Sequence, residues 1–222
     1  PTIMIKDDTI FMYYYGDSDN TATGGSIGLA TSKDFLKWER YDKSPVLKVG
    51  SADEWDSNWV ESPTVIFDEE HDLYHMYYTG INEEWRIRTG HATSKDGYTW
   101  IKDKKNPVLR EKNLDYSDRN VWDGSGAGVA AAVMDDKIYL FYASQNVKDT
   151  LKGLTNPSIG LATSLDGSSF SRCSNSALFS TTNFGENDYG PYNPTVILED
   201  EKWKIWFETG YGFGYIELER EK

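Results

Sequence analysis

Acidic residues recur just ahead of short apolar segments in this chain, and they are its clearest candidates for chemistry. Glu61 stands two residues before Pro63. Asp56 and Asp123 each follow a tryptophan that lies eight residues before the start of such a segment, at Pro63 and Ala130. Two carboxyl groups that work together can act as general acid and general base, one protonated and the other ionised. We therefore take Glu61, Asp56 and Asp123 as the candidate catalytic residues.

Each of these acids also has a purely structural explanation. A Trp-Asp pair that occurs twice can cap the loop between two repeats, because aspartate side chains accept hydrogen bonds from nearby backbone N–H groups. Glu61 can equally be a solvated loop acid near the end of a strand. Only the position of each side chain separates the two interpretations.

Aromatic residues lie in the same stretches and indicate a ligand rich in hydroxyl groups. The chain has 8 Trp and 15 Tyr, and its net charge of −13, from 23 basic and 36 acidic residues, disfavours nucleic acid and anionic membranes. A flat ring packs on the C–H face of a sugar, although most aromatics of the repeated segments are expected in the core. The candidate sugar-binding residues are Trp55, Trp59, Trp122, Tyr189, Tyr192 and Asn193.

The segments that must position these residues occur as four repeats in the sequence. The most regular segment is aromatic, and its four copies end 64, 64 and 66 residues apart, at Gly16, Gly80, Ser144 and Gly210. A shorter segment precedes each copy and starts at Pro1, Pro63, Ala130 and Pro194. β-branched and aromatic residues fill these segments, while Gly, Asp, Asn, Ser and Pro fill the gaps. Repeated units of four short antiparallel strands predict an all-β fold, a β-propeller whose first strands line the central channel.

The repeats predict one domain over residues 1–222, divided at about 1–62, 63–129, 130–193 and 194–222. The fourth repeat fades near residues 213–217, before a fourth strand is evident. The first repeat starts abruptly at Pro1, so we expect that the N-terminal part of the protein precedes this sequence. Four blades are visible, and we expect five in the complete protein.

The order of the repeated segments resembles a known superfamily. The residues that carry the resemblance are Pro-Thr-Val-Ile at 63–66, Tyr-His-Met-Tyr-Tyr-Thr-Gly at 74–80, Gly-His-Ala-Thr-Ser-Lys-Asp-Gly-Tyr-Thr-Trp at 90–100 and Asn-Pro-Val-Leu at 106–109. They are similar to the five-bladed propeller glycosidases, which include arabinanases, β-xylosidases, invertases and levansucrases, and most of all to family 43 glycoside hydrolases and their uncharacterised relatives. The resemblance covers essentially the whole chain and is specific for the fold rather than for the substrate.

The resemblance implies a role for each acid. In the family, a Glu two residues before the Pro of a first strand is the general acid, and Glu61-Ser62-Pro63 matches that pattern. In the same family, the general base and a further Asp each stand directly before the corresponding Pro of the two preceding blades. If the match holds, these two acids lie upstream of Pro1. The implied function is a glycoside hydrolase that acts on a glycan or oligosaccharide in the propeller channel by two-carboxylate chemistry. This chain alone would then be inactive.

Three other functions stay open. A non-catalytic carbohydrate-binding propeller has the same fold. A glycoside phosphorylase of the same shape needs a basic phosphate site, for which Arg86, Arg88 and Arg119 lie in suitable loops. The segment 94–100 is close to the Asp-box of sialidases but one residue too short, and its Asp-Gly step is typical of a tight turn.

Other ligands leave little trace in the sequence. No cluster has transition-metal spacing, so no cofactor is expected, although Ca²⁺ in the channel needs only oxygen ligands and stays open. Cys173 is the only cysteine, which rules out an intramolecular disulfide. No apolar run reaches the roughly 18 residues of a membrane span. The expected partner is a carbohydrate substrate, with neither nucleic acid nor membrane.

Overall fold

Strands account for most of the regular structure in this computed structural model, which describes residues 1–17, 24–112, 117–118, 120–151, 157–180, 190–210 and 212–220. In that part of the chain there are 16 strands and one helix of five residues. They fall into two units, Pro1–Leu109 and Arg110–Lys222. The one helix is too short to cross a membrane, and no described helix is long and apolar enough to do so.

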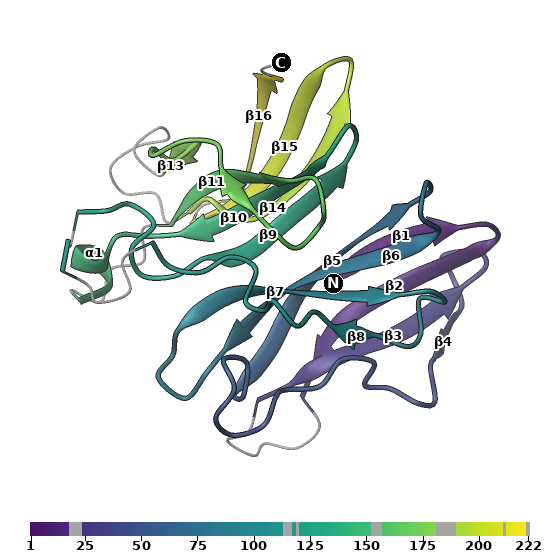
Figure 1. The fold of residues 1–222 in the computed structure, drawn as a ribbon. Coiled ribbons are helices and arrows are strands. Elements are labelled where there is room, and N and C mark those ends of the chain that lie inside the picture. Colours follow the sequence, from purple (N-terminus) through teal and green to yellow (C-terminus); the bar gives the residue numbers. More distant parts are fainter. Residues whose placement is uncertain are drawn as a thin grey trace. The chain divides into compact units, whose positions relative to one another are not determined.

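Unit 1 contains two four-stranded antiparallel sheets, each with its strands in sequence order. Blade 1 consists of β1 (Thr2–Lys6), β2 (Thr9–Gly16), β3 (Ser26–Ser32) and β4 (Trp38–Arg40). Blade 2 consists of β5 (Trp59–Asp68), β6 (Leu73–Ile81), β7 (Ile87–Ser94) and β8 (Ile101–Lys102) (Figure 1). β5 starts four residues earlier than the apolar segment at Pro63 suggests, because its pairing with β6 continues through an irregularity described below.

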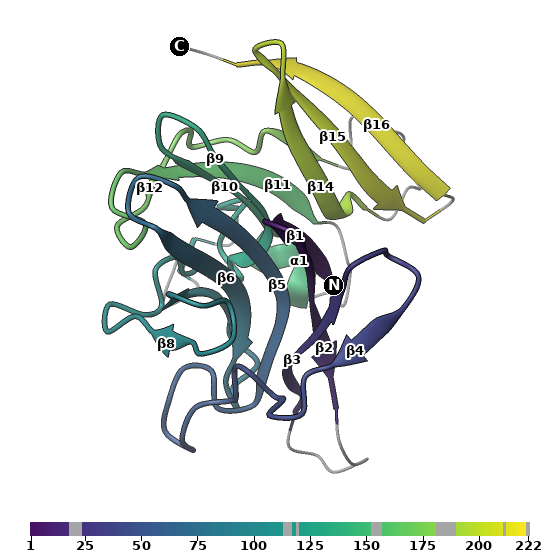
Figure 2. The ribbon, with the colours of Figure 1, turned by 90° about the vertical axis from the view of Figure 1, so that its right-hand side faces the viewer.

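Unit 2 repeats this plan with variations. Blade 3 consists of β9 (Gly128–Met134), β10 (Ile138–Ser144), β11 (Ser158–Ser164) and β12 (Ser171–Arg172), with β13 (Phe179–Ser180) paired to β11. The helix α1 (Val147–Leu151) follows β10. Blade 4 consists of the three strands β14 (Tyr192–Glu199), β15 (Lys202–Thr209) and β16 (Gly212–Glu219), and Figure 2 shows them as one hairpin-connected sheet. The predicted all-β fold of repeated antiparallel blades is confirmed, including a fourth repeat without a fourth strand in its described part.

The third and fourth strands of each complete blade are joined by a turn around an aspartate, which reads Asp-Gly in blades 2 and 3 and Asp34-Phe35 in blade 1. In blade 2, Asp96 accepts hydrogen bonds from the backbone N–H groups of Tyr98 and Thr99, at 2.8 and 2.7 Å. Gly97 has φ +74°, a conformation that side chains with a Cβ rarely adopt. Asp34 and Asp166 make the same bonds in blades 1 and 3. The turn is therefore a structural repeat and needs no sialidase-type explanation.

An aromatic residue of the second strand packs over a glycine of the third strand in every blade. In blade 2, Tyr78 is paired with Gly90, and a Cβ on that glycine would lie 2.4 Å from the ring. The other pairs are Tyr14 with Gly28, Tyr142 with Gly160 and Phe207 with Gly214. The segment ends Gly80 and Gly210 align Tyr78 with Glu208, whereas the register shows that Phe207 is the equivalent residue.

The core of unit 1 lies between its two blades. Tyr13 and Leu29 of blade 1 pack in one buried cluster with Val60, Met76 and Tyr78 of blade 2. Burial of apolar surface of this kind is the main force that holds one sheet on the next. This packing fixes β5 and β6 in place, and β5 carries two of the predicted site residues of the unit, Trp59 and Glu61.

Candidate functional site

A β-bulge in β5 positions Glu61. Two residues of β5, Ser62 and Pro63, oppose the single residue Tyr78 of β6. Ser62 has φ 49°, in the left-handed region that few residues other than glycine occupy. Bulges of this kind redirect a side chain and are common beside active sites. The local structure at Glu61-Ser62-Pro63 is therefore that of a positioned residue in a strand, and the acid does not belong to a free loop.

The Glu61 carboxyl group is half-buried, and its burial raises its pKa above the usual value of a glutamate. Loss of water around a carboxylate disfavours the charged form, so the proton is retained to higher pH. Within the described part of the chain, no residue makes a hydrogen bond or ion pair with this carboxyl group. A raised pKa and an uncommitted carboxyl group are what a general acid requires.

Aromatic side chains extend the face of β5 that carries Glu61. Trp59 is two residues before Glu61, so the two side chains leave the strand on the same face. The Trp59 ring lies 4.8 Å from the ring of Trp85, and its Nε1 donates a hydrogen bond to the Tyr15 hydroxyl at 3.0 Å. Trp85 is 65% exposed and has φ 59°, which is strained for so large a residue. We call Tyr15, Trp59 and Trp85 the aromatic platform.

Sequence analysis had identified Trp59 of this platform and missed its other two members. Tyr15 looked like one more aromatic of the second strand, and Trp85 lies in the β6–β7 connection, whose sequence does not recur in the other repeats. The available signal was the composition of that connection, because an exposed tryptophan in an otherwise charged loop is uncommon.

Asp56 is bonded inside blade 2. It is 1% exposed, lies 2.6 Å from the Lys102 ammonium group and accepts a hydrogen bond from the Tyr78 hydroxyl at 3.0 Å. The Trp55 ring packs against Tyr78 with 5.7 Å between ring centres. A Cβ on Gly80 would lie 2.3 Å from Trp55, so the glycine makes room for the indole. Trp55 and Asp56 thus fill a socket in their own blade, formed by Tyr78, Gly80 and Lys102.

Blade 3 contains the same arrangement. Asp123 is fully buried, lies 2.5 Å from the Arg172 guanidinium group and accepts a hydrogen bond from the Tyr142 hydroxyl at 3.2 Å. Trp122 packs against Tyr142, and a Cβ on Gly160 would lie 2.4 Å from the indole. The two Trp-Asp pairs are therefore equivalent, as their spacing suggests, and each is bound to a cation of the fourth strand.

The structure does not bring Asp56 and Glu61 together. Glu61 is paired with Thr79 of β6. Asp56 instead contacts Tyr78, the residue of β6 that comes directly before Thr79. Successive side chains of a strand point to opposite faces, so the two acids lie on opposite faces of blade 2. The catalytic role of Asp56 stays a prediction. Its bonds go to the Lys102 and Tyr78 side chains, which agrees with a structural role, although not with a cap made through backbone N–H groups.

The predicted residues of blade 4 meet at a second bulge. Asn193 and Pro194 oppose Phe207, and Asn193 has φ 43°, so Tyr192 takes the place in β14 that Glu61 has in β5. The Asn193 amide donates a hydrogen bond to Glu208 at 3.2 Å. Glu208 is an exposed carboxylate that sequence analysis did not single out. Tyr189 lies outside the described residues.

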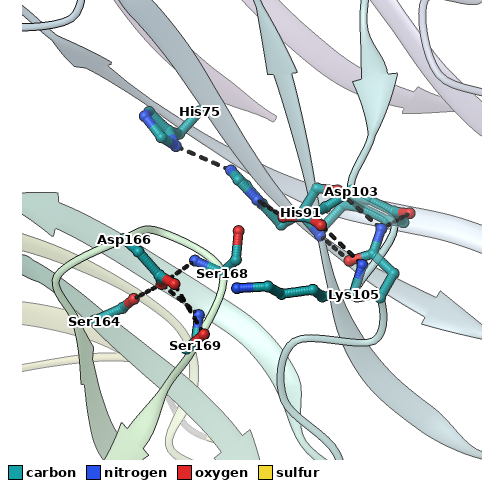
Figure 3. Close-up of polar contacts among 10 residues, drawn as sticks. His75, His91, Asp103, Lys105, Ser164, Asp166, Ser168 and Ser169 are labelled. Carbon is teal, nitrogen blue, oxygen red and sulfur yellow. Dashed lines mark hydrogen bonds and ion pairs between the residues drawn. The ribbon is translucent and has the colours of Figure 1, made fainter.

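A chain of buried polar residues crosses blade 2. His75 Nδ1 lies 2.9 Å from His91 Nε2, and His91 Nδ1 lies 3.0 Å from Asp103 (Figure 3). Asp103 can only accept while ionised, which assigns the Nδ1 proton to His91 and makes His75 the donor to His91. Burial and the neighbouring His91 lower the pKa of His75 to about 4. No group of three or more His, Cys, Asp or Glu in the described part of the chain could hold a metal ion.

Comparison with known proteins relates this geometry to a family. The model of the glycosyl hydrolases family 32 N-terminal domain matches residues 1–153. No curated protein matched the sequence. Solved structures with the same fold include fructan 1-exohydrolase IIa from Cichorium intybus, at 17% identity and a TM-score of 0.72, over 98% of this chain and 41% of that one. The family 117 glycoside hydrolase Zg3597 from Zobellia galactanivorans aligns at 12% identity and a TM-score of 0.76, over 98% and 65% of the two chains.

An exo-β-1,3-galactanase from Phanerochaete chrysosporium aligns at 18% identity and a TM-score of 0.65, over 97% of this chain and 46% of that one. The chain thus spans less than two thirds of the length of these three structures. The resemblance to the propeller glycosidases is confirmed, and the family whose model matches is 32 where the sequence had seemed most like 43. With more than half of its length matched by that model, the chain belongs to the glycosyl hydrolases family 32 N-terminal domain family.

Proposed function

We propose that this chain carries the acid side of a glycoside hydrolase site, with Glu61 as the general acid and the aromatic platform as a sugar subsite. The observation that carries the proposal is the half-buried, uncommitted Glu61 carboxyl group at the β5 bulge, in a chain that belongs to a glycosyl hydrolase family. Its raised pKa keeps a larger protonated fraction near neutral pH than an exposed glutamate would have. A protonated carboxyl group can donate its proton to the departing glycosidic oxygen.

The aromatic platform supports a carbohydrate as the ligand. Trp59 and Trp85 offer ring surface beside Glu61, and a sugar ring packs on such surface through its C–H groups. Fructan and galactan are named for two of the matched structures, and a third is a Bombyx mori β-fructofuranosidase in complex with sucrose. The proposed substrate class is therefore a glycan or oligosaccharide, with fructosides and galactosides as the first candidates.

The second carboxylate is proposed to come from polypeptide outside residues 1–222. Asp56 and Asp123 are each buried and held by a cation and a tyrosine hydroxyl, which disfavours a role in activating water or attacking a sugar. The resemblance places the base directly before the Pro of a preceding blade, upstream of Pro1. Losing one of two cooperating carboxylates typically costs about two to four orders of magnitude in rate.

The ion pairs of Asp56 and Asp123 also favour a second candidate, a carbohydrate-binding propeller without catalysis. Such a protein needs the aromatic platform and no second acid. A phosphorylase has less support, since Arg86 pairs with Glu84 at 3.0 Å and Arg119 lies outside the described residues.

Hydrolysis and binding assays on two polypeptides separate these functions. The 222-residue chain and a version extended upstream by one blade are assayed on sucrose, fructans and aryl glycosides of fructose, galactose, arabinose, xylose and mannose. The proposal predicts sugar binding by both and turnover only by the extended polypeptide, abolished by Glu61→Gln. Binding without turnover in the extended polypeptide would establish the binder instead. Turnover by the short chain, lost in Asp56→Asn or Asp123→Asn, would overturn the assignment of those acids to blade structure.

A further inference from the structure

Unit 1 contains a cavity of about 200 Å³ at the end of blade 1, beside the aromatic–glycine pair of that blade. It is larger than the space that a single water molecule needs. Asp17, Gly24, Gly25 and Ser26 line it, together with six residues that have counterparts in blade 2: Tyr14, Gly16, Gly28, Arg40, Ser44 and Pro45.

Each of these six residues has a counterpart in blade 2, where the corresponding space is filled. Arg40 pairs with Ala30 as Lys102 pairs with Ala92, so the two cations occupy one register position. Gly16 is the counterpart of Gly80, two residues after the second-strand tyrosine in each case. The remaining counterparts are Tyr78 for Tyr14, Gly90 for Gly28, and Asn106–Pro107 for Ser44–Pro45. In blade 2 the Trp55 ring lies over the glycines, and the Asp56 carboxylate binds Lys102 and Tyr78.

Among the described residues, no tryptophan lines this space in blade 1. Of the described atoms, a Cβ on Gly16 would meet only those of the Tyr14 ring, at an unstrained 3.6 Å, whereas a Cβ on Gly80 would lie 2.3 Å from Trp55. The Arg40 Nε donates a hydrogen bond to the Tyr14 hydroxyl at 3.1 Å. Within the described part of unit 1, no carboxylate forms an ion pair with Arg40, while Lys102 and Arg172 each bind a buried aspartate.

We propose that this cavity is a receptor for a third Trp-Asp step, carried by polypeptide that precedes β1. The indole lies against Tyr14 between Gly16 and Gly28, and the carboxylate binds Arg40 and the Tyr14 hydroxyl. Trp55 and Trp122 precede Pro63 and Ala130 by eight residues, so the occupant stands eight residues before Pro1. A cation that is matched to an acid in two other blades provides the charge complementarity. This inference does not depend on the catalytic role of Glu61.

The test extends the chain with a copy of residues 53–62 placed directly before Pro1, which puts the copied tryptophan at the required spacing. We expect the extension to raise the urea midpoint of unfolding and to increase the ratio of folded to unfolded protein at least tenfold at a fixed urea concentration. Changing the copied tryptophan to alanine, or the copied aspartate to asparagine, should remove most of this gain. Sedimentation velocity checks that extended and original chains are both monomeric.

Two variants of the receptor make the test specific. Arg40→Glu should cancel the gain, and changing the copied aspartate to arginine should restore it in that background. Gly16→Ala has room in the original chain and should block the indole only in the extended one. A gain that persists through the tryptophan and Arg40 changes would overturn the proposal, as would no gain at all. Occupation of the cavity by a second copy, seen as dimerisation of the original chain that Arg40→Glu removes, would also overturn it.

Discussion

The carboxylate of the buried Asp56 lies 2.6 Å from the ammonium nitrogen of Lys102, a side chain that is partly exposed. Asp123 and Arg172 repeat the relationship at 2.5 Å. In both places a tryptophan precedes the acid and packs over a glycine of the same sheet. Both acids, which are predicted to be catalytic from their spacing, thus link an inter-blade loop to the sheet of the following blade.

The first prediction concerns this ion pair. Lys102→Met leaves the buried Asp56 carboxylate without its cation, and breaking a buried pair in this way typically costs about 3–5 kcal/mol. Lys102 is partly exposed, so we expect the lower end of that range. Lys102→Arg, which copies the blade 3 pair, is the matched control and should lose less than about 1 kcal/mol. Urea unfolding measures both, and equal losses in the two variants would contradict the ion-pair account.

The second prediction compares two glycines in equivalent positions. Gly80→Ala places a methyl group 2.3 Å from the Trp55 ring, and overpacking of this kind costs about 1–3 kcal/mol. Gly16→Ala meets its nearest atom at 3.6 Å and should change stability by less than about 0.5 kcal/mol. The measurement is the unfolding free energy of both variants in the 222-residue chain. Similar losses at both positions would show that the indole does not occupy the Gly80 socket.

The third prediction concerns His75 and acid. The pKa of His75 is lowered from 6.5 to about 4 in the folded chain, chiefly by burial and then by His91. Between these values the unfolded chain binds a proton that the folded chain does not, so stability falls as the pH drops from about 6.5 to 4 and is fully present above 6.5. The shift corresponds to at most about 3 kcal/mol.

Replacement of His75 should flatten this part of the pH profile. His75→Phe keeps an aromatic ring against His91 and removes the titrating group, so its stability should depend less on pH over that window. His71, which is exposed and forms an ion pair with Asp68, is left unchanged in both proteins. Stability is measured by urea unfolding at a series of pH values. A wild-type slope in His75→Phe would contradict the prediction.

The fourth prediction tests the aromatic platform. Trp85→Ala removes an exposed ring that packs against Trp59, and we expect sugar binding to weaken about 5- to 30-fold while the unfolding free energy changes by less than about 1 kcal/mol. Phe213, which is 84% exposed in blade 4, provides the control Phe213→Ala. Calorimetric titration with fructo- and galacto-oligosaccharides measures the affinity. Equal binding by the wild type and Trp85→Ala would remove the platform from the proposed site.

Much of the fold could be predicted because the repeated units are defined by residues that lie close together in the sequence. The Asp-Gly turn at Asp96, the alternating apolar segments and the repeated glycines each leave a local signal, and the structure has the corresponding turns and strands. The equivalence of Trp55 and Trp122 could also be read from their common spacing. What the spacing could not reveal was the face of the sheet on which each side chain lies.

The site residues illustrate that limit. Asp56 and Glu61 are five residues apart in sequence, yet the pairing with β6 puts them on opposite faces, and a single-residue bulge decides the direction of Glu61. Lys102 is 46 residues from Asp56 in the sequence, and no local sequence pattern predicts their contact. Trp85 joins the site only because the β6–β7 connection folds back to Trp59, a long-range contact without a sequence motif.

The most direct test of Glu61 as the general acid is the dependence of the Glu61→Gln rate on the leaving group, measured in the polypeptide extended upstream by one blade. A missing acid matters most when the departing oxygen is strongly basic. The account predicts a loss of about 10²–10⁴-fold on natural oligosaccharides, and little loss on aryl glycosides whose phenols leave without protonation. Wild-type rates on both substrate classes, or the same loss on both, would contradict a general-acid role for Glu61.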